Sequence, residues 1–128
     1  MLVISHGFLN DLAAHRPFSE LAPAIRNEIA QALAIHVPVV VVTPAATPAA
    51  FTTQKTTLPA YASGELQIAR GFGSPNVYTV DLLSQMKQYI TAHHLNYESF
   101  AYDGWHPNSA GHALAGALLA QNLAKMFR

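Results

Sequence analysis

The sequence predicts a single α/β domain in which helices cover both faces of a parallel sheet. Three observations lead to this prediction. Apolar, largely β-branched runs recur along the chain, each is followed by a segment with apolar residues at helical spacing, and 128 residues suffice for one domain. Such alternation favours parallel strands joined by right-handed crossovers. The carboxyl ends of these strands then meet at one rim, where ligands usually bind.

Three segments are predicted to be strands. Met1 to Ile4 is continuously apolar, as is typical of a strand buried on both faces, and it leads into a glycine-containing turn over residues 5–11. By residue pattern alone it is either a short edge strand at the N-terminus or an interior strand of a chain truncated at its front. Val37 to Val42 is interrupted only by Pro38, near its start, where proline is tolerated. Asn76 to Val80 is short and ends just before an aspartate.

Four segments have the apolar spacing of helices. Ser19 to Ile35 begins with a serine suited to capping a helix, and Ser109 to Phe127 has the clearest pattern. Pro59 to Arg70 and Leu82 to Thr91 have weaker patterns. The segment from Ala45 to Pro59 is rich in Ala, Thr and Pro. It is predicted to be a surface loop, either a substrate-facing lid or a solvated connection.

The composition excludes several classes of protein. Seven basic and seven acidic residues cancel, which argues against a surface for nucleic acid or anionic membranes. No apolar run reaches the roughly 18 residues of a transmembrane segment, and the absence of cysteine excludes disulfides. Residues 1–5 lack the features of a signal peptide. Localisation stays open, because any export signal would lie upstream of Met1.

The irregular segment 93–107 contains the densest cluster of candidate catalytic residues. An aspartate three residues before a histidine, as in Asp103-Gly104-Trp105-His106, can place its carboxylate against Nδ1 of the imidazole. That bond fixes the tautomer and leaves Nε2 free to act as a general base. Asn108 or Ser109 is suited to capping the helix that follows. By spacing alone this motif is common, and a structural aspartate beside a surface histidine is the default interpretation.

A second candidate lies in the turn after the first predicted strand. Asn10 is expected at the same rim, because the carboxyl ends of parallel strands lie together. An asparagine amide in a cleft can donate to a developing oxyanion, a contribution of roughly 3–4 kcal/mol. The alternative is a turn asparagine followed by Asp11 as a helix cap.

Together these motifs resemble the later sequence blocks of the SGNH/GDSL serine hydrolases. The likeness runs from Val3 to Phe127 and is most specific over D-G-W-H-P-N-S-A-G-H, whereas G-F-L-N-D carries one more residue than the family's G-x-N-D. The resemblance implies a flavodoxin-like, three-layer α/β/α fold. It implies hydrolysis of carboxylic esters, often acyl or acetyl groups on lipids or sugars, without a cofactor. It also implies Asn10 as an oxyanion donor, His106 as general base and Asp103 as its orienting partner.

The sequence departs from this family in one respect that matters for activity. The family's nucleophilic serine belongs to a G-D-S block on an earlier strand, and no G-D-S occurs here. Ser5 alone precedes the Asn10 turn, and it lies on the wrong strand. We therefore expect a chain truncated at its front, with DNA upstream of the Met1 codon encoding a complementing N-terminal segment that carries the serine.

Two other classes of function stay open at this stage. Asp103, His106 and His112, together with His6, are ligand types suited to zinc. A non-catalytic binding domain or degenerate enzyme is the other alternative.

Overall fold

The computed structural model describes residues 1–128 and contains a three-stranded parallel sheet in the order β1-β2-β3. The strands are β1 (Leu2–Ser5), β2 (Val39–Val42) and β3 (Val77–Val80). They are paired in register, with Leu2 opposite Val39 and Val39 opposite Val77. The predicted α/β class with a parallel sheet is confirmed.

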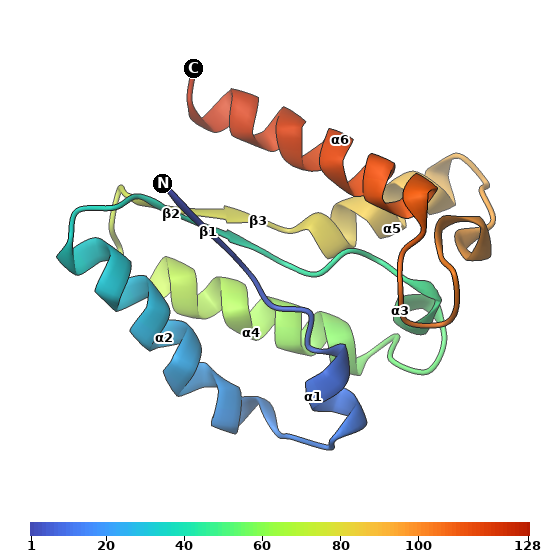
Figure 1. Ribbon diagram of the computed structural model, residues 1–128, viewed down its shortest axis with the longest axis horizontal. Coiled ribbons are helices and arrows are strands. Elements are labelled where there is room, and N and C mark those ends of the chain that lie inside the picture. Colours follow the sequence, from blue (N-terminus) through green and yellow to red (C-terminus); the bar gives the residue numbers. More distant parts are fainter.

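Helices lie on both faces of this sheet (Figure 1). On one face α2 (Phe18–Ala34) and α4 (Thr57–Gly71) pack side by side, with the short α1 (Leu9–Ala13) beside them. On the other face lie α5 (Leu82–Ala92) and α6 (Ser109–Met126). Two short helices, α3 (Pro48–Phe51) and the 3-10 helix η1 (Tyr97–Phe100), lie at the rim where the strands end. The arrangement is compatible with a three-layer α/β fold.

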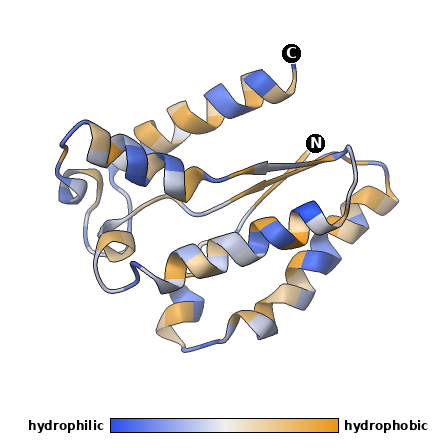
Figure 2. Ribbon diagram, turned by 180° about the vertical axis from the view of Figure 1, so that it is seen from behind, coloured by the Kyte–Doolittle hydropathy of each residue, from blue (hydrophilic) through white to orange (hydrophobic).

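The core is centred on β2, whose four valines are all buried. A central strand covered on both faces needs such a run, because neither set of its alternating side chains meets water. The helices supply amphipathic surfaces and carry both hydrophobic and hydrophilic residues (Figure 2). From α2 the residues Ile25 and Ile29 enter the core, and from α5 Leu83 and Met86 do so.

Strand β1 differs from its prediction. It lies at the edge of the sheet, paired only with β2, and of its residues only Ile4 is buried. Leu2 and Val3 remain 40% and 44% exposed. The prediction of burial on both faces is therefore wrong, whereas the alternative prediction of an N-terminal edge strand is confirmed.

The segment from Ala45 to Pro59 is not the predicted surface loop. It contains α3 and the start of α4, and Ala46, Ala49 and Ala50 are buried. The backbone N–H of Ala46 contacts Sδ of Met86 at 3.4 Å. Alanine is small enough to let this backbone pack closely against α5, so a composition typical of loops here forms part of the interior.

Two predicted helix starts also differ. Helix α2 begins at Phe18 after Pro17, without a side-chain cap, so Ser19 lies inside the helix and does not cap it. Asn10 lies in the first turn of α1, after Phe8 rather than in an open turn. The other predicted helices are confirmed with ends shifted by one or two residues.

Candidate functional site

The Asp103–His106 pair lies in a tight loop that is closed by backbone hydrogen bonds. Ala101 and Pro107 form an antiparallel bridge, and the Tyr102 N–H donates to the His106 carbonyl at 2.9 Å. Within this loop His106 Nδ1 lies 2.9 Å from Asp103 Oδ2. The predicted contact between the two side chains is therefore present. His106 Nε2 makes no hydrogen bond within the chain.

Asp103 also accepts hydrogen bonds from the loop backbone. Its Oδ1 accepts from the N–H groups of Trp105 at 2.7 Å and His106 at 2.8 Å. These hydrogen bonds lower the pKa of the Asp103 carboxyl to about 2. The bond from the Trp105 backbone has the largest effect, followed by those from the side chain and the backbone of His106. The carboxylate is thus ionised at every pH at which imidazole chemistry operates, and it orients the ring with Nδ1 toward itself.

Two elements hold this loop in place from behind. Asn108 caps α6, because its Oδ1 accepts from the Gly111 N–H at 3.0 Å while its Nδ2 donates to the Ser99 carbonyl at 3.0 Å. Between the two candidate caps the structure selects Asn108. From the other side the Ala49 N–H donates to the Gly104 carbonyl at 2.8 Å. The sequence does not predict this hydrogen bond, because nothing in an Ala/Pro-rich segment indicates which carbonyl its N–H groups will meet.

The structure brings Asn10 and His106 to the same cavity. Its volume is about 340 Å³, and one wall comes from the β1–α1 region and the other from the Asp103–His106 loop. It is lined by Gly7, Phe8, Leu9, Asn10, Asp11, Ala13, Trp105 and His106. The Asn10 side chain makes no hydrogen bond within the chain, so its amide is available to a ligand. The predicted meeting of the two motifs at one rim is present in the structure.

The site is open to solvent. The side chains of His106 and Asp103 are 74% and 54% exposed. No serine, threonine or cysteine lines the cavity, and Ser5 is an exposed residue of the edge strand. The arrangement contains an oriented imidazole and a free amide donor, but no side chain that a nearby base would turn into a nucleophile.

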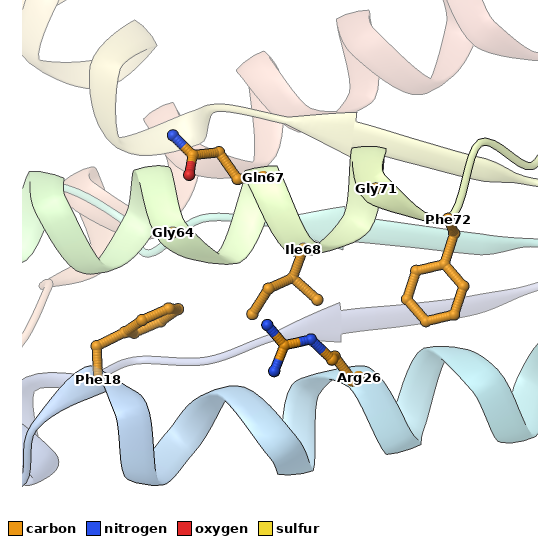
Figure 3. Close-up of a pocket in the computed structure, with 7 residues that line it drawn as sticks. All are labelled: Phe18, Arg26, Gly64, Gln67, Ile68, Gly71 and Phe72. Atoms are coloured by element: carbon orange, nitrogen blue, oxygen red, sulfur yellow. The ribbon is translucent and has the colours of Figure 1, made fainter.

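A larger groove elsewhere contains less chemistry. It lies between α2 and α4 and has a volume of about 540 Å³. Figure 3 shows Arg26 reaching up from α2 and Ile68 pointing down from α4, with the rings of Phe18 and Phe72 at its two ends. Arg26 is its only charged side chain, and an arginine does not serve as a general base. The groove therefore offers no acid–base pair.

No known protein family, curated protein or solved structure matches this chain. No group of three or more His, Asp or Glu side chains is arranged to hold a metal ion. The candidate zinc ligands named from the sequence therefore do not form a common metal site. No helix combines the length and the apolar composition needed to span a membrane.

Proposed function

We propose that this chain is part of a serine esterase of the SGNH/GDSL type, to which it contributes the Asp–His pair and an oxyanion donor but not the nucleophile. One observation carries the proposal: His106, oriented by Asp103, faces the same cavity as the free amide of Asn10. A base and an oxyanion donor on opposite walls of one cleft are the groups that acyl transfer requires besides the nucleophile.

Each residue has a role that its contacts support. His106 Nε2 removes the proton from a serine hydroxyl and later returns it to the leaving alcohol. Asp103 keeps the proton of the neutral ring on Nδ1 and stabilises the imidazolium. The Asn10 amide donates to the carbonyl oxygen as negative charge develops there.

The unpaired edge of β1 supports a place for the missing serine. A strand added in parallel to this edge would end at the rim where Asn10 and His106 lie, because parallel strands present their carboxyl ends together. A Gly-Asp-Ser turn at that end would bring a hydroxyl to the cavity. This order of strands is the one that the proposed flavodoxin-like fold requires.

The cavity favours a small acyl group as substrate. Phe8, Leu9, Ala13 and Trp105 contribute its apolar wall, and a volume of about 340 Å³ accommodates a short acyl chain. The leaving group, a lipid or sugar alcohol in the proposed family, would extend into solvent through the open side.

The proposal is tested by restoring the nucleophile. The chain is produced alone and with an N-terminal extension that contains an apolar strand ending in Gly-Asp-Ser, and both are assayed on short-chain p-nitrophenyl esters. We expect hydrolysis only from the extended protein, and none when its serine is changed to alanine. Equal activity of the alanine version, or no activity in an extended protein that is folded and monomeric, would reject the proposal.

Because no nucleophilic side chain lines the cavity, a second candidate function is a non-catalytic domain that binds esters or related carbonyl compounds. In that case the chain alone binds a short-chain ester at the Asn10 cavity, and the extended protein binds without turning over. Chemical-shift changes at Asn10 and Trp105 during titration with the ester detect the binding.

A further inference from the structure

A second histidine–carboxylate cluster lies directly behind the Asn10 turn. His6 follows β1, and its Nδ1 lies 2.6 Å from Oε1 of Glu65 on α4. On the other side of the ring, Nε2 lies 3.2 Å from Oε2 of Glu28 on α2. Glu65 is fully buried and its Oε2 has no hydrogen-bond partner. Burying a carboxylate that has one oxygen without a hydrogen-bond partner costs folding free energy. The bond from Glu65 to His6 therefore points to a role for this pair.

The charge of this cluster depends on the proton of His6. The hydrogen bond to Glu65 raises the pKa of the His6 imidazole, despite the opposing effect of its partial burial. Burial raises the pKa of Glu65 as well. The charged groups that face His6 are Glu65 from α4 and Glu28 from α2, and no charged residue of β1 or α1 is bonded to it. A protonated ring therefore bridges two carboxylates on two different helices.

The same ring supports the turn that carries Asn10. His6 stacks on Phe8, with ring centroids 5.8 Å apart and planes inclined by 22°. Phe8 is buried, has a φ of 59°, and begins α1 by accepting the Leu12 N–H on its carbonyl at 2.8 Å. A bulky residue adopts this left-handed conformation only where its surroundings impose it. Asn10 lies in the helical turn that starts from this residue.

We propose that His6 is a positioning residue: clamped in its protonated form between Glu65 and Glu28, it fixes Phe8 and thereby the orientation of the Asn10 amide. Loss of the His6 proton breaks the charged bridge, and the turn loosens. The role of Asn10 as an oxyanion donor depends on the proposed function, whereas the clamp itself depends only on the contacts described above.

The direction of the pH effect follows from the raised pKa of His6. A group whose pKa is higher in the folded than in the unfolded state stabilises the fold below its unfolded value, roughly pH 6.5, and this stabilisation is lost as pH rises through the folded value. The α1 turn is therefore most stable below the His6 transition and loosens as pH rises through it.

Hydrogen exchange and NMR on this chain test the clamp without any enzymatic assay. Protection factors of the Leu12 and Ala14 amides, corrected for intrinsic exchange, are measured between pH 5.5 and 9 alongside amides of α6. We expect α1 protection to fall, by at most about tenfold per pH unit, as pH rises from the unfolded His6 value of roughly 6.5 through the titration midpoint of His6, and to level off above that midpoint, while α6 is unchanged. Protection of α1 that is independent of pH, or that falls in step with α6, would overturn the proposal.

Two variants separate the charged clamp from simple packing. Glu65→Gln keeps the shape and a hydrogen bond but removes the charge, so the titration midpoint of His6 and the loss of α1 protection should both shift to lower pH. Glu28→Gln, at an exposed position, should shift both in the same direction by a smaller amount. This variant keeps the test decisive if the buried Glu65→Gln variant folds poorly. His112→Gln, on α6, removes a histidine that makes no contact with the clamp and should change neither. An unshifted His6 midpoint in both Glu variants would refute the clamp.

Activity of the extended protein distinguishes the two proposals. If both are correct, Glu65→Gln lowers kcat with KM unchanged, and the loss is largest at pH values between the His6 midpoints of the variant and the unmodified protein. If the clamp is present by exchange and NMR but the extended protein is inactive, the esterase proposal fails and the clamp remains.

Discussion

The carboxylate of Asp103 organises the loop in which it lies. Two backbone N–H groups and the His106 ring all donate to its carboxylate, so the loop and the imidazole are positioned by one side chain. The lowered pKa of this carboxyl means that the hydrogen bonds stabilise the loop fully above about pH 4 and are lost as pH falls through about 2.

The acid transition of the loop is therefore expected near pH 2 rather than near 4. The amide shifts of Trp105 and His106, followed by NMR during acid titration, report it directly. Asp103→Asn should abolish the transition while leaving α6 shifts in place. A midpoint at the ordinary aspartate value would show that the carboxylate is not held by the loop in solution.

The candidate catalytic residues should differ in their effects once a serine is supplied. In the extended protein His106→Ala should be nearly as damaging as loss of the serine, and Asp103→Asn should lower kcat by up to about 10⁴-fold because the ring adopts the wrong tautomer. Asn10→Ala should lower kcat by about 10²–10³-fold, the effect of removing one oxyanion donor. His112→Ala should leave the chemical step unchanged. Strong loss at His112 with little at His106 would contradict the assignment.

Helix α6 anchors the Asp103–His106 loop through its first turn. Gly111 is the one buried residue of this helix, and it packs against the Phe100 carbonyl and Pro107. A Cβ at this position would clash with the Phe100 carbonyl oxygen and lie 2.9 Å from Cβ of Pro107, and neither the backbone carbonyl nor the proline ring can move away easily. Gly116, one and a half turns later, faces open space.

This contrast gives a matched pair of substitutions. Gly111→Ala should destabilise the protein by about 1–3 kcal/mol through overpacking, and it should displace the Asp103–His106 loop. Gly116→Ala should stabilise it by about 0.5–1 kcal/mol, because alanine restricts the unfolded chain and favours the helix. Urea unfolding measures both, and equal effects would show that the first turn of α6 does not press on the loop.

Periodicity predicted the elements that carry a strong apolar pattern. The β2 valines and α6 were found because their patterns extend over enough residues to identify one type of element. The Asp103–His106 contact was predicted because both residues belong to one short loop. The interior position of residues 45–51 was not predicted. A segment rich in alanine, threonine and proline has the same composition whether it forms a solvated loop or a close packing contact. The His6–Glu65 pair was missed because 59 residues separate its members and no local pattern joins them.

At the scale of the whole molecule, the sheet is unevenly covered. Side chains of β1 alternate between the two faces, so Leu2 and Val3 point in opposite directions, and both remain exposed. Met1, Leu2, Ile35 and Val37 line an apolar groove of about 790 Å³ along the start of this strand. An exposed apolar edge strand is a template for pairing with another chain.

We therefore expect the isolated chain to self-associate through β1. Val3→Lys adds a charge to the edge without entering the groove beside α2, and it should shift the protein toward monomer in sedimentation velocity at micromolar concentration. Thr91→Lys, at an exposed position of α5, adds the same charge far from the edge and should leave the association unchanged. A complementing strand that binds the same edge should also dissolve the assemblies of the unmodified chain. A monodisperse monomer with a sharp, cooperative melt would show that the edge is not used for pairing, and the place proposed for the serine-bearing strand would then lose its support.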